Sequence, residues 1–219
     1  VYWSVLIAAL IQHFDAYTEL HVDVNNVRDK LVELGVEDEI TFHFPKMEPG
    51  RIRGLLDRWE RPSGVYSADP TLVADIIIAA DMGEETEYWQ RLVAVKELLH
   101  LADCADLSAE SAEAVNVLFR NFALPPELRY GKKPLTTNTN SYLNDETRFY
   151  LALAVLVPLG CRVPLRQLYK AERLRAAEIA DLAKIPERFI PEVMGDHFDL
   201  VIENFLAWEE DTIANGHGK

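Results

Sequence analysis

Cysteine, glycine and proline are scarce in this 219-residue sequence, which contains 2, 10 and 11 of them respectively. Two cysteines cannot build a disulfide framework, and so low a number fits a reducing compartment. The low glycine and proline counts exclude collagen-like and low-complexity proteins. With 49% hydrophobic residues, the chain is also too apolar to be intrinsically disordered. We therefore expect a globular protein that is long enough to bury its own core.

Positive charge is scarce as well. The sequence has 22 lysines and arginines against 36 aspartates and glutamates, which gives a formal net charge of -14. An acidic surface repels phosphate, so we expect nucleic acid not to be a partner over any broad surface. The sequence has no Gly-x-Gly-x-x-Gly, Walker loop or Cys-x-x-Cys pair. Nothing in it therefore supports nucleotide-dependent chemistry.

Long hydrophobic runs are missing too. The longest run, residues 5–11, is far shorter than the ~20 residues that a membrane helix needs. It has no basic segment before it and no small-residue cleavage site, so it is not typical of a signal peptide. We therefore expect a cytoplasmic protein with no membrane partner.

The first half of the sequence predicts helices and short strands. Apolar residues at helical spacing indicate a helix from Trp3 to about Tyr17, and a second helix is expected over residues 26–34. The alternation around Phe42 and the β-branched run at residues 75–79 predict two strands, of which the second is buried. Residues 51–68 are ambiguous, because they combine a turn signal with a possible short strand.

The second half predicts mostly helices. We expect one helix over residues 85–104 and another near residues 112–119, followed by an irregular stretch at 124–144. Asn144 then caps an apolar helix that ends near Pro158. Further helices are expected over residues 164–183 and 196–213, with a short turn between them. The predicted fold class is α+β, mainly helical with a small sheet.

The segment most suggestive of chemistry is Lys96-Glu97-Leu98-Leu99-His100. In a zincin helix, two histidines at i and i+4 face one metal ion, and a glutamate after the first polarises the bound water. Glu97 and His100 stand in the right relation for this pattern, but Lys96 occupies the first ligand position. Glu-x-x-His alone is also explained by an exposed acid and a core-facing histidine.

Two further patterns accompany this helix. A strand at residues 75–79 and an acidic turn precede it, and residues 145–158 form an apolar helix that opens with two acids and ends in Leu-Val-Pro. Together these segments resemble the ImmA/IrrE-type metallopeptidase family, which has a strand, a His-Glu-x-x-His helix and a helix that opens with an acidic third ligand. The resemblance covers roughly residues 26–191. It implies a zincin-like domain over residues 1–160 and a helical C-terminal region over residues 161–219.

The resemblance also implies roles for single residues. Glu97 would be the general base, and His100 with Asp145 or Glu146 would hold the metal. Lys96 departs from the family pattern, because an ammonium is no metal ligand. Deprotonating a lysine at pH 7 costs about 4.6 kcal/mol before any metal bond forms. We therefore expect no cofactor or only weakly bound zinc, and no ordinary zinc peptidase activity.

The departure at Lys96 leads to a sharper hypothesis, in which its ammonium replaces the cation. It would pair with Asp145 or Glu146 and hold a former active site together. On this hypothesis the chain is a catalytically impaired relative of the family. It would act as a regulatory or protein-binding component with a protein or peptide partner. A phage or mobile-element origin fits, since members of the family often cleave or antagonise repressors.

Two alternatives concern the same residues. The chain could be an active metal-dependent endopeptidase with an atypical site, in which Glu97 still acts as the base. Conversely, Asp145 and Glu146 need no metal, because acids are favoured at the positive end of a helix. His100, Asp103 and Cys104 also share a helix face and are a less specific metal-site pattern.

A third alternative is a DNA-associated regulator. Residues 162–188 carry more basic than acidic residues and include the clearest basic patch of the chain, which consists of Arg166, Lys170, Arg173 and Arg175. Residues 179–190, which follow this patch, are faintly similar to the start of a helix-turn-helix. A solvated helical face explains the same pattern.

Overall fold

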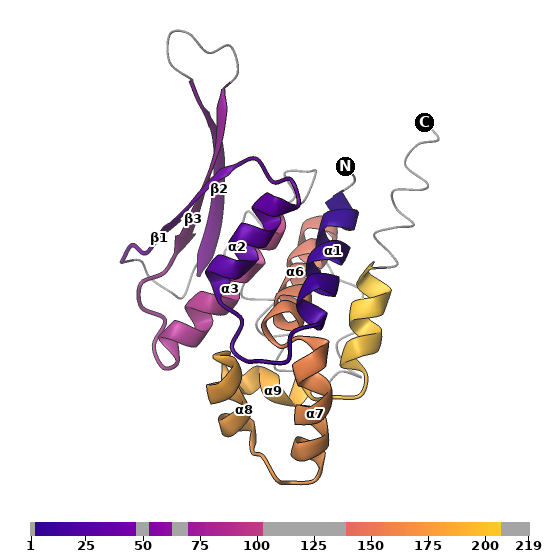
Figure 1. Ribbon diagram of the computed structural model, residues 1–219. Helices are drawn as coiled ribbons and strands as arrows, with labels where there is room; N and C mark the ends of the chain where they lie inside the picture. Colours follow the sequence, from indigo (N-terminus) through magenta and orange to yellow (C-terminus); the bar gives the residue numbers. More distant parts are fainter. Residues whose placement is uncertain (1–2, 47–52, 63–69, 103–138, 207–219) are drawn as a thin grey trace.

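A computed structural model describes residues 3–46, 53–62, 70–102 and 139–206, and the side chains of 3–5 and 139–146 are outside that description. Helices and a small sheet are combined in one chain, which confirms the predicted α+β class (Figure 1). The helix predicted near residues 112–119 lies outside the described residues, as do residues 124–138 of the predicted irregular stretch.

Three strands form one mixed sheet in the order β1-β3-β2. The central strand β3 (Thr71–Ile78) runs parallel to β1 (Glu39–His43) and antiparallel to β2 (Gly54–Arg61). β1 and β3 confirm the two predicted strands. β2 occupies the stretch that the sequence left ambiguous. The sequence signal of this strand is weak because most of its side chains are exposed, so hydrophobic and polar residues hardly alternate.

Helices cover one face of this sheet. α2 (Val24–Glu33) and α3 (Thr86–His100) lie on that side, with α1 (Trp3–Asp15) and α6 (Thr139–Leu156) beyond them (Figure 1). Ala74, Ile76 and Ile78 of β3 alternate toward the helices and are completely buried. α1, α2 and α3 confirm the helices expected in the first part of the chain.

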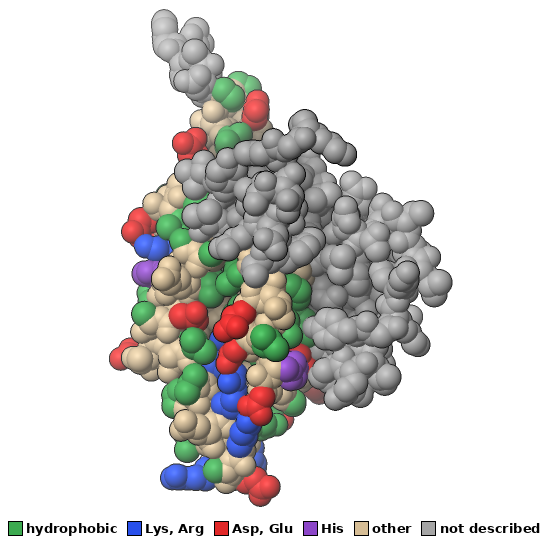
Figure 2. Space-filling model, turned by 90° about the vertical axis from the view of Figure 1, so that its right-hand side faces the viewer, with side chains coloured by type: hydrophobic (Ala, Val, Ile, Leu, Met, Phe, Trp, Pro, Cys, Tyr) green, Lys and Arg blue, Asp and Glu red, His purple; other side chains and the backbone are tan. Residues whose placement is uncertain are grey.

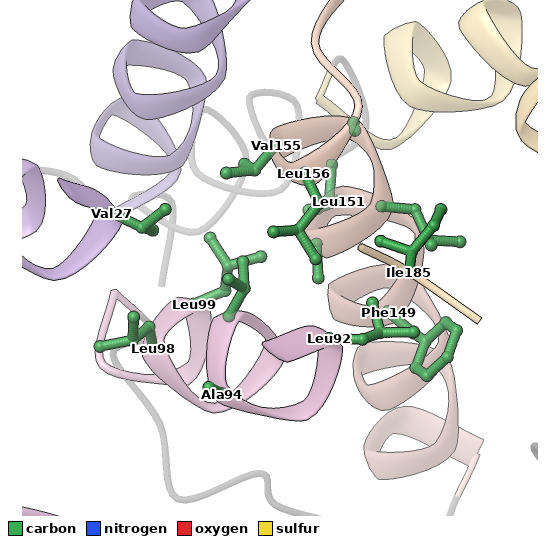
Figure 3. Close-up of a cluster of buried hydrophobic side chains, with 14 of the residues drawn as sticks. Val27, Leu92, Ala94, Leu98, Leu99, Phe149, Leu151, Val155, Leu156 and Ile185 are labelled. Carbon is green, nitrogen blue, oxygen red and sulfur yellow. The ribbon is translucent and has the colours of Figure 1, made fainter. Parts of the chain in front are cut away.

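The core lies between α3 and α6. α3 is buried on most of its surface, and apolar side chains of α3 and α6 meet one another and Val27 of α2 (Figure 3). Eight residues of α3 are buried, and one of them is the charged Glu97. α3 is therefore the element on which the sheet, α2 and α6 are assembled.

β2 approaches α3 so closely that only glycine fits at its first position. A Cβ on Gly54 would lie 2.2 Å from Val93 Cγ1 and 3.0 Å from Glu97 Oε1. Both distances are shorter than normal contacts, so any side chain here would push β2 away from the helix. Gly54 thus brings the edge strand against the face of α3 that carries Glu97.

Two helix predictions in the second half were wrong. α6 begins at Thr139 rather than after Asn144, because the Thr, Asn and Ser residues that we interpreted as loop form its first turn at only a small propensity cost. The single helix predicted over residues 164–183 is two helices, α7 (Leu159–Lys170) and α8 (Ala176–Ala183). Pro164 lies inside α7 instead of starting a helix, and Glu172 adopts a left-handed conformation, with φ of 55°, between the two helices.

The rest of the C-terminal region is short and helical. A 3-10 turn, η1 (Glu187–Phe189), leads into α9 (Ile190–Val193), and residues 198–206 form a further helix. Ile179, Phe189 and Phe198 join the same buried cluster as the residues of α1 and α3. The described parts on both sides of residue 160 therefore share one core, while the domain boundary stays a prediction.

No single helix in the described ranges is long and apolar enough to cross a membrane. Residues 147–156 and α7 meet that criterion only as a pair bent by 84°. Residues 149–156 of this pair belong to the buried core.

A network of ion pairs connects the helix at residues 198–206 to α7. Asp199 accepts hydrogen bonds from Arg162 Nε at 2.8 Å and from Arg166 Nη1 at 2.7 Å. The Arg162 side chain is only 3% exposed and also donates to the carbonyl of Val157. Burial by itself would raise the pKa of Asp199, but the hydrogen bond from Arg166 and the charges of Arg162 and Arg166 outweigh it, so the pKa lies below its usual value.

We predict that Asp199→Asn lowers the free energy of unfolding by about 2 kcal/mol at pH 7, because it leaves the buried Arg162 without its carboxylate. This is less than for a fully buried pair, since the Asp199 side chain is 27% exposed. A lowered carboxylate pKa stabilises the folded state above the unfolded value of about 3.9, and this contribution is lost as the pH falls through the folded-state pKa. Urea denaturation at several pH values should show a constant difference between variant and parent from pH 7 to about 5, and a shrinking one below about 4.

The control for this prediction is Asp29→Asn in α2, where Asp29 pairs with Arg28 on the surface. Its effect should stay below about 1 kcal/mol. A difference between Asp199→Asn and the parent that persists unchanged to pH 3 would contradict the proposed role of the ion pair.

Candidate functional site

The candidate site is built on the second half of α3. The turn that leads into this helix is held by Thr86, whose hydroxyl accepts from the Met82 N–H at 3.0 Å and donates to the Gly83 carbonyl at 2.6 Å. Gly83 has a φ of +81°, a conformation that side chains disfavour. From this fixed start, 3.6 residues per turn carry Lys96 and Glu97 into the interior of the molecule.

Lys96 and Glu97 form an ion pair that is largely removed from water. The Lys96 Nζ lies 3.1 Å from Glu97 Oε1, and the two side chains are only 13% and 5% exposed. A buried carboxylate is strongly unfavourable unless a positive charge or hydrogen-bond donors compensate it. Lys96 supplies a positive charge in direct contact with the carboxylate that the resemblance identifies as the general base.

The two side chains start from different faces of α3. Leu92 and Leu99 point toward α6 (Figure 3), and helical spacing puts Lys96 on the same face. Val93 and Glu97 lie on the face that packs against Gly54 of β2. Neighbouring residues on a helix do not normally face each other, so the long lysine side chain must reach across the helix to meet Glu97.

Of the other predicted site residues, the structure describes the side chain of His100 but only the backbone of Asp145 and Glu146. His100 is the last residue of α3 and is partly exposed, one turn beyond Lys96. Asp145 and Glu146 lie on α6, the helix that packs against α3, so the two predicted segments are brought together. The side chains of Asp145 and Glu146 are outside the described part, as are Asp103 and Cys104 entirely, so their pairing or metal binding stays a prediction.

The described side chains of this site do not fit a zinc ion. Zinc binds neutral imidazole, thiolate and carboxylate groups, whereas the first ligand position holds an ammonium that is engaged with Glu97. In the parts of the chain that the structure describes, no three His, Cys, Asp or Glu side chains are grouped so as to hold a metal. The disagreement with a zinc site rests on the chemistry of Lys96.

The basic helix behind the DNA alternative is α7 with the turn that follows it. Figure 2 shows Lys and Arg side chains beside Asp and Glu side chains along the lower part of one face. Arg166 pairs with Asp199, Lys170 with Asp196, and Arg175 with Glu178. These internal pairs offset the positive charge that phosphates would need to meet. α9, where a recognition helix would follow α8, has only 4 residues.

Sequence reasoning missed Gly54 as part of this site. A glycine at the start of an unrecognised strand carries no pattern of its own, and its role depends on the approach of β2 to α3. The ion pair between Lys96 and Glu97 was also not predicted, because the sequence hypothesis pairs the Lys96 ammonium with Asp145 or Glu146. Adjacent helical positions give no signal for such a contact.

No family model, curated protein or solved structure matches this chain.

We predict that Lys96→Met lowers the free energy of unfolding by about 3 kcal/mol, because it leaves the Glu97 carboxylate buried without its cation. The double variant Lys96→Met, Glu97→Met should recover most of that loss, since both charges are then replaced by apolar groups of similar length. Chemical denaturation of the parent, the two single variants and the double variant measures this coupling.

A matched control is Lys30→Met on α2. It breaks the ion pair between Lys30 and Glu33, and the Glu33 side chain is mostly exposed. It should change the free energy of unfolding by less than about 1 kcal/mol. If the effects of Lys96→Met and Glu97→Met simply added in the double variant, the ion pair would not be a stabilising unit.

Proposed function

We propose that this protein is a catalytically impaired relative of the ImmA/IrrE-type metallopeptidases that acts as a regulatory or protein-binding component. The observation that carries the proposal is the Lys96–Glu97 ion pair, with Nζ and Oε1 3.1 Å apart. It supplies a cation from the protein itself at the position where the family would place a metal ligand.

The ion pair is incompatible with the chemistry of a zinc peptidase. In such enzymes the metal lowers the pKa of a bound water to about 7, and the glutamate takes a proton from that water. A lysine ammonium has three N–H donors and no coordination position for water. Glu97 is held against it, so the carboxylate serves the stability of α3 and not the activation of a nucleophile.

The surrounding scaffold supports a retained binding role. α3 and α6 still pack along one another, and Gly54 still admits β2 beside Glu97. Under the proposal, this framework presents a surface to a protein or peptide partner in the cytoplasm, where two cysteines fit a reducing environment. Phage or mobile-element proteins that control repressors are the context that the resemblance implies.

The proposal predicts that the purified chain, saturated with zinc and then desalted, retains no stoichiometric metal and shows no chelator-sensitive peptide hydrolysis. Lys96→His should bind zinc at least about a hundredfold more tightly than the parent, because it replaces an ammonium by an imidazole whose deprotonation costs little at pH 7. Zinc titration with a competing chromophoric chelator measures both affinities.

Lys96→Met is the matched control, since it removes the ammonium without supplying a ligand, and it should not gain zinc affinity. Stoichiometric zinc in the parent chain, with hydrolysis that Glu97→Gln abolishes, would identify an active peptidase and overturn the proposal. Equal zinc affinity of Lys96→His and Lys96→Met would contradict the family resemblance itself.

A further inference from the structure

The sheet has a second face, directed away from α3. Register places rows of residues on it, because residues that lie opposite each other on neighbouring strands share a face. Across β1, β3 and β2, three of these rows are Glu39–Val73–Trp59, Thr41–Asp75–Asp57 and His43–Ile77–Leu55. A fourth row, beyond the end of β1, pairs Thr71 with Arg61, and Arg61 is neutralised by an ion pair with Glu39. Burial alternates from Ala74 to Ile78, since Ala74, Ile76 and Ile78 face the helices and are buried, whereas Asp75 and Ile77 are partly exposed. Val73, on the second face, is buried as well.

Two carboxylates lie directly opposite each other at the centre of this face. Asp57 of β2 is the register partner of Asp75 of β3. Like charges in opposite positions of a sheet are destabilising, and aspartate is disfavoured in strands generally. Both residues lie on the face away from the helices, so contacts with the described helices do not explain the pair.

Asp75 is fixed as an acceptor by its neighbours. Trp59 Nε1 donates to Oδ2 at 2.8 Å, and His43 Nε2 lies 2.8 Å from Oδ1. These contacts, first from Trp59 and then from His43, hold the pKa of Asp75 below its usual value. The Asp75 carboxylate therefore stays charged beside Asp57.

Asp57 itself is exposed, and no described side chain forms an ion pair with it. Large apolar side chains flank it on the same strand and the same face: Leu55 is 43% exposed and Trp59 is 41% exposed. The Trp59 ring also offers a π face on which a guanidinium or ammonium binds favourably. Negative charge is thus concentrated between two exposed apolar side chains.

We propose that this sheet face docks a partner protein through an arginine or lysine side chain flanked by apolar residues. The basic group would lie at Asp57, relieving the repulsion from Asp75, while its apolar neighbours cover Leu55 and Trp59. Charge complementarity favours such a partner over a second copy of this chain, since two copies would bring acidic faces together. The inference does not rest on Lys96, which lies on the helix that covers the opposite face.

The test titrates the full chain, labelled with ¹⁵N, with capped synthetic peptides in which one arginine is flanked by leucine, phenylalanine or tryptophan. NMR should show shifts of the Trp59 indole resonance and of the β2 amides, while matched peptides with glutamate in place of arginine should leave them unchanged. Asp57→Asn should weaken binding of the arginine peptides at least about tenfold. This variant should fold at least as stably as the parent, because it removes the repulsion between Asp57 and Asp75.

Glu60→Gln is the matched control. Glu60 is the register partner of Leu72, so it lies on the same strand but on the other face, and its loss of charge should change the affinity less than about twofold. Failure of every arginine peptide to bind, or equal binding to the parent and to Asp57→Asn, would overturn the proposal. A dimer in solution that buries this face would assign it to a second copy and overturn it as well.

Discussion

A carboxylate buried inside a small domain has to be compensated, and in this protein the compensation comes from the preceding residue. Lys96 and Glu97 leave α3 on different faces, yet the lysine reaches across to within 3.1 Å of the carboxylate. α3 is the helix against which the sheet, α2 and α6 pack. The stability of the central element therefore depends on keeping these two charges together.

Close packing explains why this pair is kept away from water. Gly54 lets β2 lie directly on Val93 and Glu97, which closes one side of the carboxylate. Apolar side chains of α6 cover the side of α3 that carries Leu92 and Leu99 (Figure 3). In a site of this kind the attraction between opposite charges is strong, and loss of either partner leaves an unfavourable buried charge.

Much of the fold could be predicted from sequence wherever periodicity reflects burial. α1, α2, α3, β1 and β3 each bury one face or more, so their apolar spacing is clear. β2 was not recognised because it is an edge strand with mostly exposed side chains. The break between α7 and α8 could not be predicted because residues 171–175 contain no glycine or proline, and Glu172 takes the left-handed conformation instead. The spacing of Lys96, Glu97 and His100 pointed to a candidate site, but the contacts of these residues depend on tertiary packing that no local pattern encodes.

The two faces of the sheet carry different chemistry. The helix-covered face meets a paired carboxylate that serves stability, and the other face presents Asp57 to solvent between Leu55 and Trp59. Under the two proposals, the buried pair keeps the core together, while a partner binds on the exposed face. Among the basic residues of α7, Arg166 pairs with the partly buried Asp199, whereas Lys170 pairs with Asp196 at the surface.

We propose that the Lys96 ammonium replaces a metal ion. The most direct measurement is a zinc titration of the ¹⁵N-labelled chain, followed at the His100 imidazole and the Lys96 ammonium nitrogens. One equivalent of zinc should leave both resonances unchanged and Lys96 paired with Glu97. A stoichiometric shift of the His100 nitrogen, with release of the Lys96 ammonium from Glu97, would show that the site still binds metal and would contradict the account.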